Sequence, residues 1–427
     1  MCYNVFVFVY RKGIDMKALV LAGSCVQVVL LELLKARGIE TVLADNNVNA
    51  IARPYADHFV KVDLLNCEAV KQVAIEQQVD FLITVCADQV LITVAKVSEE
   101  LGLPCYIDYQ TAVDVSDKSL MKDIFHKNGI PTSKNVFMSE LDLARIADMS
   151  YPLVVKPADA YSSKGVRKVT NEEELRQFFA EAAQISRSGL VIVEEYVDGA
   201  EITVDFQVVD GVAYLLSASN TEKVDYKDRF VPFRTRYPAA ISADTLERIR
   251  VIGQKIADAF GLKNSPMLVQ LLTNDKQESV LEFCARNGGG AKYALIRFAS
   301  GFDPIDGVIR LTLGEPVTVV PTPPRHKYFV NEFLYGYPGV FDHLEGFEEL
   351  KQEGVLNEYW QFKWPGAEII QAISSGDRIA GINIIADSFE ELVAKHNKAA
   401  ATIRAISRDG EDMLRHDLLT PLGDLSL

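Results

Sequence analysis

The sequence predicts a parallel α/β unit followed by α+β units, and three observations lead to this fold class. From Met16 to about Tyr109, short apolar runs alternate with stretches of helical spacing, which is typical of parallel strands joined by helices. Beyond that point, apolar runs come in pairs around turn-prone dipeptides such as Asp210-Gly211, which indicate antiparallel hairpins. The linker Thr322-Pro-Pro-Arg then precedes a last segment of strands and one helix.

Length, charge and cysteine usage narrow the class of protein. A chain of 427 residues that is 48% hydrophobic can bury large cores and has the length of two to four domains. The net charge of −15 disfavours nucleic acid or an anionic membrane as a partner. The six cysteines form no Cys-x-x-Cys pair, and no apolar run reaches the roughly 20 residues of a membrane span. We therefore expect a cytoplasmic globular protein, and leave open whether it forms a homodimer.

The first unit, residues 16–110, is predicted to be Rossmann-like because strands and helices alternate along it. Its expected strands are Lys17–Ala22, Glu40–Ala44, Phe81–Val85 and Leu103–Ile107, and its expected helices are Val26–Lys35, Glu68–Glu76 and Val90–Glu100. Dinucleotide binding is not favoured, because the first turn has one glycine where the fingerprint needs three. Residues 1–15 precede a second start at Met16 and are expected to be an extension without a role in the fold.

The middle of the chain is predicted to contain two hairpins and three helices. Asp117 or Ser116 caps a helix that ends at Asn128-Gly129, and Asn171 caps another that runs to about Gln184. The remaining expected elements are the strands Tyr151–Pro157, Val166–Val169 and Leu190–Val197, the hairpin Glu201–Val209 with Val212–Ser219, a charged loop Glu222–Tyr237, the helix Ala243–Phe260 and the hairpin Met267–Leu272 with Ser279–Phe283. In the last segment a helix is expected from Phe389 to about Ile406.

The second hairpin carries a candidate metal site. Gln270 and Glu282 lie twelve residues apart, so both face one side of the sheet if the turn adds no register slip. Each would then offer oxygen to a hard cation such as Mg²⁺, or Mn²⁺ in its place. Arg286 follows, and after it come three glycines that let backbone N–H groups approach an anion: Gly288, Gly289 and Gly290. The alternative is an ordinary hairpin with one polar residue on each arm.

A second candidate segment begins at Lys156, where a predicted strand ends. A loop of small residues, including Ser162 and Ser163, follows and closes on Gly165. Hydroxyl and backbone donors together with a lysine are suited to cover phosphates, although the Walker spacing is absent. The alternative is a plain surface turn.

A third candidate segment is the strand that stops on two adjacent acids, Glu194 and Glu195. One of the two must point the way the apolar residues point, while the other is solvated. We expect one carboxylate to accept the amino group of an adenine, and the backbone of Tyr196 and Val197 to pair with the ring edge. Glu201 would then hold ribose hydroxyls.

In their order along the chain these segments, together with Lys118, resemble the ATP-grasp superfamily, preceded by its usual Rossmann-like domain. The resemblance covers roughly residues 16–314, and the tail is similar to the small C-terminal domain of the same enzymes. It implies an ATP-grasp domain over 111–321, with a lid subdomain at about 130–195, and a C-terminal α+β domain over 322–427. It also implies that ATP lies between two subdomains, with Lys118 and Lys156 on its phosphates and Mg²⁺ on the last strands.

One motif departs from the family pattern, and other residues are similar to two different groups within the family. The last motif is usually Glu-x-Asn-x-Arg, whereas here it is Glu282-Phe-Cys284-Ala-Arg286, which removes one oxygen ligand. Gln270 is similar to the glutamine of carbamoyl-phosphate synthetase large subunits. The stretch Phe233-Arg-Thr-Arg-Tyr-Pro and the glycine triplet are closer to amino-acid ligases of the carboxylate–amine type.

The resemblance therefore implies a carboxylate–amine ligase that forms an acyl phosphate from ATP and a small carboxylate, and then an amide with a small amine. Lys156 and Arg286 would neutralise charge during phosphoryl transfer. The triplet Gly288–Gly290 would hold the carboxylate or acyl phosphate, and Arg234 and Arg236 are candidates for substrate recognition, with a solvated basic loop as the alternative. Two rival functions remain: an enzyme that makes carbamoyl or carboxyl phosphate, and an ATP-binding protein without turnover.

Overall fold

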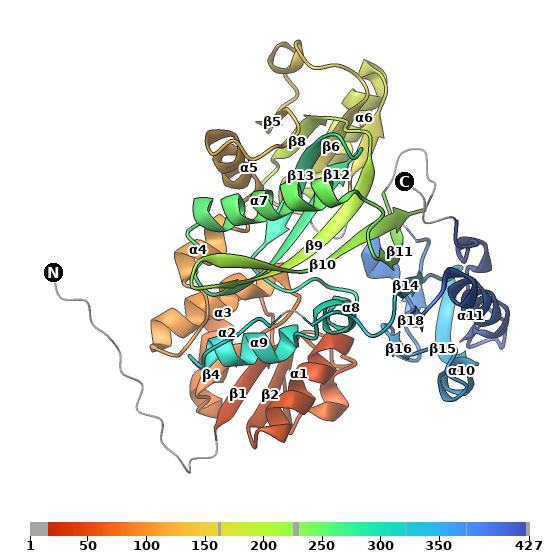
Figure 1. Ribbon diagram of the computed structural model, residues 1–427. Helices are drawn as coiled ribbons and strands as arrows, with labels where there is room; N and C mark the ends of the chain where they lie inside the picture. Colours follow the sequence, from red (N-terminus) through yellow and green to blue (C-terminus); the bar gives the residue numbers. More distant parts are fainter. Residues whose placement is uncertain (1–15, 161–163, 225–229, 321, 373, 424–427) are drawn as a thin grey trace.

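The computed structural model describes residues 16–160, 164–224, 230–320, 322–372 and 374–423. The expectations for residues 1–15 and for Ser162 and Ser163 lie outside these ranges. No helix in the described ranges is both long and apolar enough to cross a membrane. Figure 1 shows the parallel unit at the bottom, two long strands across the middle, a small sheet at the top and the C-terminal segment at the right.

The first unit is a four-stranded parallel sheet with the order β3-β2-β1-β4, so the predicted alternation is confirmed. Apolar side chains from both of its faces are buried beneath helices. Its strands are β1 (Lys17–Leu21), β2 (Glu40–Asp45), β3 (His58–Lys61) and β4 (Phe81–Ile83), and its helices are α1 (Cys25–Ala36), α2 (Cys67–Gln77) and α3 (Asp88–Leu101).

One strand prediction in this unit is wrong and one strand was missed. Leu103–Ile107 joins no sheet, because Pro104 cannot donate to a ladder, and Ile107 is instead buried in the core of the next unit. The short edge strand β3 was overlooked because its four residues are partly or fully exposed and show no buried apolar run.

A small antiparallel sheet with the order β5-β8-β6-β7 forms the top of the molecule. Leu175 and Phe179 of the covering helix are buried against it. Its elements are β5 (Asn135–Met138), β6 (Leu153–Pro157), β7 (Arg167–Val169), β8 (Val191–Glu195) and α6 (Glu172–Ile185), and α4 (Tyr109–Asp114) and α5 (Lys118–Lys127) precede it. The predicted caps are confirmed, since Asp117 accepts hydrogen bonds from Ser119 and Leu120, and Asn171 accepts one from Glu174.

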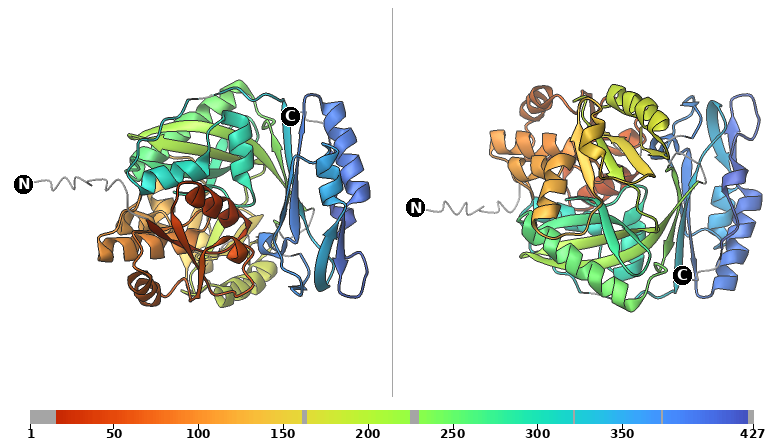
Figure 2. Two further views of the ribbon diagram at one scale, coloured as in Figure 1. Left: turned by 90° about the horizontal axis from the view of Figure 1, so that it is seen from below. Right: turned by 90° about the horizontal axis from the view of Figure 1, so that it is seen from above.

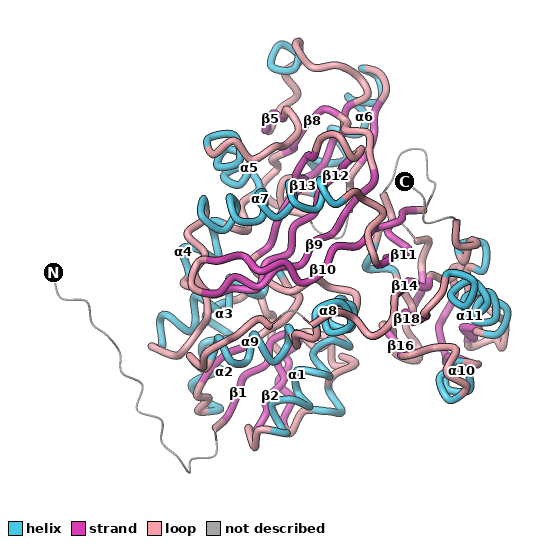
Figure 3. Tube along the Cα trace, in the orientation of Figure 1, coloured by secondary structure: helices cyan, strands magenta, loops and turns pink. Residues whose placement is uncertain are grey.

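The largest sheet has eight strands in the order β13-β12-β9-β10-β11-β14-β18-β16. Figure 3 shows its long strands β9 and β10 between α7 on one side and α8 and α9 on the other. The strands are β9 (Ala200–Val209), β10 (Val212–Lys223), β11 (Pro232–Tyr237), β12 (Ser265–Thr273), β13 (Glu278–Cys284), β14 (Tyr328–Leu334), β16 (Glu358–Gln361) and β18 (Ala380–Ala386), and the helices are α7 (Ala243–Ala259), α8 (Lys292–Ser300) and α9 (Pro304–Thr312).

Both predicted hairpins are confirmed within this sheet, but the loop expected at Glu222–Tyr237 is partly wrong. Its second half is the strand β11, which pairs with β10 and β14. The stretch looks like a loop in the sequence because it is charged. Its arginines are nevertheless satisfied inside the sheet, where Glu222 and Glu332 of the neighbouring strands pair with Arg234.

The C-terminal segment adds strands to the large sheet and a second, three-stranded sheet with the order β17-β15-β19. In both views of Figure 2 it lies along one side of the molecule. Its further elements are β15 (Gly339–Glu345), β17 (Glu368–Ile369), β19 (Arg404–Ser407), α10 (Phe347–Gln352) and α11 (Phe389–Thr402). The large sheet thus continues beyond residue 322, and the domain division at that residue stays a prediction.

Candidate functional site

A cavity of about 480 Å³ lies between the small sheet and the large sheet. Three elements bring charged side chains to it. Lys156 comes from the small sheet, and Tyr196 and Val197 directly follow its strand β8. Lys118 comes from the first turn of α5, and Glu201, Gln270 and Glu282 come from the large sheet. The sequence predicted most of these residues as ligands of one nucleotide, and the structure brings them to one cavity.

Gln270 and Glu282 are direct partners across β12 and β13, so their side chains share one face of the sheet. The register of this hairpin shifts between Gln270 and Leu271, and this shift is what opposes the pair, because the residues from Leu271 toward the turn pair at odd spacing. The common face was expected for a hairpin without a register slip, whereas the structure reaches it through one. Glu282 forms an ion pair with Lys118 at 3.2 Å, and this lysine, more than any other group, lowers the pKa of the carboxyl. The amide of Gln270 donates to Glu201 at 3.3 Å.

This pair fits a magnesium ion that is also held by phosphates. Glu282 supplies an ionised carboxylate, Gln270 supplies an amide oxygen, and both line the cavity. No cluster of three or more His, Cys, Asp or Glu residues that could hold a metal occurs in the described ranges. Mg²⁺ usually takes only one or two protein carboxylates and completes its shell with water and substrate phosphates, so two protein oxygens suffice.

Glu194 is the buried member of the acidic pair at the end of β8. Lys156 donates to one of its oxygens at 2.5 Å, while Ser133 at 2.9 Å and Lys122 at 3.5 Å contact the other. Burial by itself would raise the pKa of Glu194, but the charges of Lys156 and Lys122 outweigh it and hold this pKa at about 2. Burial lowers the pKa of Lys122 to about 8, partly offset by Glu194.

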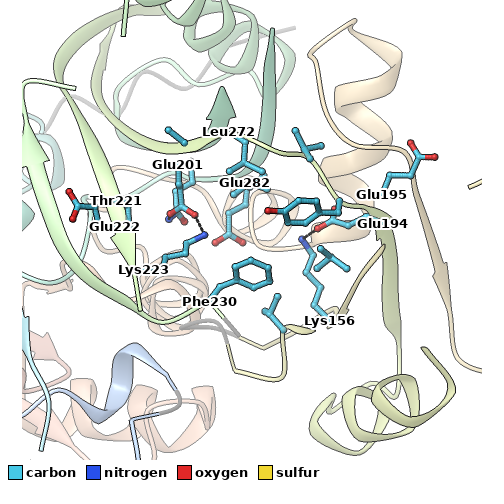
Figure 4. A pocket seen from close by; sticks show the side chains of 18 of the residues that line it. Lys156, Glu194, Glu195, Glu201, Thr221, Glu222, Lys223, Phe230, Leu272 and Glu282 are labelled. Atoms are coloured by element: carbon cyan, nitrogen blue, oxygen red, sulfur yellow. Dashed lines mark hydrogen bonds and ion pairs between the residues drawn. The ribbon is translucent and has the colours of Figure 1, made fainter. Parts of the chain in front are cut away.

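Neither acid of the pair therefore offers a free carboxylate to an adenine. The oxygens of Glu194 are occupied by the three groups above, and Glu195 points away from the cavity and accepts a hydrogen bond from the backbone of Ser150 at 3.2 Å (Figure 4). Tyr196 and Val197 do line the cavity. These two residues, rather than the two carboxylates, are therefore the part of the segment that is placed to meet a base.

Gly165 closes the loop that was predicted to cover the phosphates, and it lies beside the cavity rather than on it. Its neighbours Lys164 and Val166 line the cavity. Gly165 adopts φ +74°, and a Cβ there would come within 2.8 Å of the side chain of Ile185. Tight packing and a left-handed backbone therefore account for this glycine without a ligand.

Glu201 lies at the cavity, where it forms an ion pair with Lys223, a residue that the sequence prediction missed (Figure 4). Arg236 also lines the cavity and pairs with Glu222. Arg234 does not line it: the side chain is 1% exposed and bonds to Glu332 and Glu222. Its placement does not support a role in substrate recognition and indicates a structural ion-pair network instead.

The glycine triplet lies next to the Rossmann-like unit, and none of Gly288, Gly289 and Gly290 lines the large cavity. The carbonyl of Gly288 accepts from the thiol of Cys86 at 3.1 Å, and a Cβ at Gly288 would come within 2.8 Å of the side chain of Lys292. Close packing therefore already accounts for this glycine.

The other two glycines differ from Gly288 in their surroundings. Gly289 is exposed, and a Cβ there would meet nothing within 4 Å, so neither packing nor the large cavity requires a glycine at this position. Gly290 adopts φ +61°, and α8 begins two residues later. The placement of the triplet does not support the expectation that these three residues hold a substrate carboxylate or acyl phosphate in the large cavity.

Arg286 also lies outside the lining of the large cavity, and it is paired side-on with Asp88, the first residue of α3. The two residues line a small second cavity of about 30 Å³ together with Cys284, Lys118 and Glu282. The thiol of Cys284 donates to Asp88, and burial raises its pKa well above the ordinary value, so it stays protonated. Cys284 therefore faces the same side as Glu282.

Besides Lys223, three contacts of the site were not predicted, although two of these three had a signal in the sequence. Lys122 lies four residues after Lys118, which places both on one face of α5. Asp88 closely follows a strand of the parallel sheet, and ligands of such sheets gather at the carboxyl ends of their strands. Ser133 lies in an irregular segment and had no such signal.

Comparison with known proteins gives a family match and several relatives. The family described as "D-ala D-ala ligase C-terminus" matches residues 124–285. The D-alanine–D-alanine ligase of Aromatoleum aromaticum is 29% identical over 39% of this chain and 54% of the relative. The 3-methyl-D-ornithine–L-lysine ligase of Methanosarcina acetivorans is 28% identical over 70% and 74%. The carbamoyl phosphate synthase large chain of Clostridium perfringens is 24% identical over 66% and 26%. The chain thus spans about half of the first of these relatives and a quarter of the last.

Solved structures confirm the predicted fold class. An L-amino acid ligase from Bacillus licheniformis superposes with a TM-score of 0.77 at 21% identity, covering 92% of this chain and 99% of the other. The biotin carboxylase domain of a 2-oxoglutarate carboxylase from Hydrogenobacter thermophilus, solved with MgADP and bicarbonate, gives 0.77 at 18% identity, covering 94% and 92%. At these identities the likeness concerns the fold.

Proposed function

We propose that this chain, which belongs to the ATP-grasp superfamily, is an ATP-dependent carboxylate–amine ligase. The observation that carries the proposal is the cavity between the two sheets, where Lys118 and Lys156 face the opposed pair Gln270 and Glu282. Cations on one side and a metal-binding acid on the other are what a triphosphate with its Mg²⁺ requires. The ligase names of the relatives support the same reaction class.

The reaction would proceed in two steps. A substrate carboxylate attacks the γ-phosphate of ATP to give an acyl phosphate and ADP, and an amine then attacks the carbonyl carbon and releases phosphate. Lys118 and Lys156 would bind the phosphates, while Arg286 would neutralise charge near the transferred group. Gln270 and Glu282 would hold Mg²⁺, which lowers the charge repulsion between nucleotide and carboxylate.

The two lysines proposed to bind phosphate are engaged in ion pairs in the structure without ligand. Lys118 pairs with Glu282, and Lys156 pairs with Glu194. Entry of Mg²⁺ on Glu282 would release Lys118 toward a phosphate, so metal and nucleotide should bind together. The five cysteines in the described ranges are free thiols, which supports a cytoplasmic location.

A second candidate is an enzyme that makes carboxyl or carbamoyl phosphate, favoured by Gln270 and by the match to carbamoyl phosphate synthase large chains. The experiment that separates the two uses purified protein with MgATP and pools of amino acids. Phosphate release that depends on two substrates, with an amide found by mass spectrometry, is expected. Phosphate release with bicarbonate alone would favour the second candidate, and nucleotide binding without release would refute both.

A further inference from the structure

Asp88 links the Rossmann-like unit to the segment that follows β13, an edge strand of the large sheet. It follows β4 in the parallel sheet and opens α3. Its two oxygens accept from Nε and Nη2 of Arg286, each at 2.5 Å, and the two side chains are 18% and 14% exposed. A side-on pair with two parallel hydrogen bonds fixes both the position and the plane of a guanidinium.

The remaining contacts of Arg286 leave part of it free for a ligand. Nη1 donates to the carbonyl of Asn287 at 2.7 Å, so three of the five N–H groups are engaged with described residues. The other two N–H groups have no partner among those residues. Asp88 also accepts a hydrogen bond from the thiol of Cys284. One carboxylate therefore binds both Cys284 and Arg286, which follow Glu282 at alternate positions.

The same arginine borders the candidate nucleotide site. It shares the small cavity with Lys118 and Glu282, and these two residues also line the large cavity. A long arginine side chain without a partner would sample many rotamers, whereas a paired one is already oriented when charge develops beside it. The direction of the free N–H groups therefore depends on Asp88.

We infer that Asp88 is a positioning residue that holds Arg286 toward the transferred phosphoryl group. This role rests on the proposed ligase function. It makes the Rossmann-like unit part of the phosphoryl-transfer site, because the carboxylate that orients the arginine comes from that unit. An alternative is that Asp88 merely stabilises the start of α3 and the packing between the two units.

The test compares MgADP alone with MgADP plus aluminium fluoride, a mimic of the transferred phosphoryl group, by calorimetry on the full chain. The variants are Asp88→Asn, Asp88→Glu and Arg286→Lys, with Asp306→Asn as the control. Asp306 pairs with Arg37, so it also joins the Rossmann-like unit to the rest of the chain, but it lines neither cavity. Melting temperatures are recorded in parallel.

In wild type, aluminium fluoride should tighten binding of MgADP. Asp88→Asn should bind MgADP within about threefold of wild type and lose roughly tenfold of that tightening, the scale of one charge-assisted contact. Asp88→Glu should recover part of the tightening by aluminium fluoride, and Asp306→Asn should keep all of it. The double variant Asp88→Asn with Arg286→Lys should show no smaller tightening than Arg286→Lys alone.

Two results would overturn the inference. Full tightening in Asp88→Asn would show that Arg286 is oriented without Asp88. An equal loss in Asp306→Asn would show that any broken contact between the units has this effect. Absence of tightening in wild type, together with absence of phosphate release from ATP, would instead refute the proposed function, and the role of Asp88 with it.

Discussion

Two glutamates face the candidate nucleotide cavity from opposite sides, and their surroundings differ. The side chain of Glu194 is 4% exposed and bonds to Lys156, Lys122 and Ser133. The side chain of Glu282 is 35% exposed and forms an ion pair with Lys118. Both are ionised at neutral pH, because lysines lower both pKa values.

The difference in exposure and in the number of partners distinguishes an acid that stabilises the fold from one that can bind a metal ion. Removing one partner from a buried, saturated ion-pair network leaves uncompensated charge and destabilises the fold. A more exposed acid with one cationic partner can exchange that partner for a metal ion at little cost. Glu194 should therefore hold the small sheet to α5, whereas Glu282 should exchange Lys118 for Mg²⁺.

The largest expected effect is on turnover in Glu282→Gln. Glutamine keeps the shape but loses the charge that a hard cation prefers, so turnover should fall on the order of 100-fold. ATP affinity without metal should change little, since the base is proposed to bind at Tyr196 and Val197, which follow a different strand. Glu278→Gln is the matched control, because Glu278 is on the same strand but pairs with Arg248 away from the cavity. Wild-type turnover of Glu282→Gln across a Mg²⁺ titration would refute the metal assignment.

Lys156→Ala should lower both the affinity for ATP and the stability of the ligand-free protein. Loss of a charge-assisted contact to phosphate should weaken ATP binding by about 1.5–3 kcal/mol. The ligand-free melting temperature should also fall, because Glu194 loses its 2.5 Å partner. Titration calorimetry and thermal melts measure the two effects, with Lys71→Ala, an exposed partner of Glu100, as the control. Unchanged ATP affinity would refute Lys156 as a phosphate ligand.

Glu194→Gln should reduce stability in a pH-dependent way. The folded pKa of about 2 lies below the ordinary value of 4.5, so this acid contributes stability above pH 4.5 and loses it as pH falls toward 2. A shift of this size corresponds to about 3 kcal/mol. Thermal melts of wild type and variant should differ by several degrees at pH 6, and the difference should shrink as the pH falls from 4.5 toward 2. A difference that is independent of pH would contradict the assigned ion pairs.

Much of the fold was predictable because it depends on local pattern. The alternation in the first unit, the caps at Asp117 and Asn171 and both hairpins follow from spacing and turn residues alone. The pair Gln270 and Glu282 was expected from an even spacing without a register slip, but the structure opposes the two residues through a register shift beside Gln270, which the spacing does not predict. The strand β11 was not predictable, because burial of its arginines depends on acids from β10 and β14 that are distant in sequence.

The division of roles within the site was less predictable for the same reason. The sequence shows two adjacent acids at the end of β8 but not which one meets Lys122 and Ser133, since those partners come from other elements. Arg286 was identified as a functional cation, whereas its partner Asp88 is almost 200 residues away and depends on how the first unit packs on β13. Long-range charge pairing is therefore the part that spacing cannot supply.

The smallest expected effect is in Cys284→Asn, which restores the residue usual in the family motif. Cys284 faces the side of Glu282 and donates its thiol to Asp88. An asparagine amide can donate to the same carboxylate and still offer an oxygen toward the metal. The Mg²⁺ concentration for half-maximal turnover should therefore fall or stay equal, and stability should change by less than about 1 kcal/mol.

Cys25→Asn is the comparison that makes this small effect informative. Cys25 is 7% exposed and packs in an apolar core, so an asparagine there should cost about 1–3 kcal/mol for an amide without partners. If Cys284→Asn lowers the melting temperature as much as Cys25→Asn does, the amide finds no acceptor, and position 284 belongs to the core. If Cys284→Asn lowers the melting temperature less than Cys25→Asn does, the amide has found a partner, and the surroundings of residue 284 between Glu282 and Asp88 are polar. The thiol would then occupy a place where an oxygen ligand can be accommodated, so the metal site would have been reduced by one ligand without loss of its surroundings.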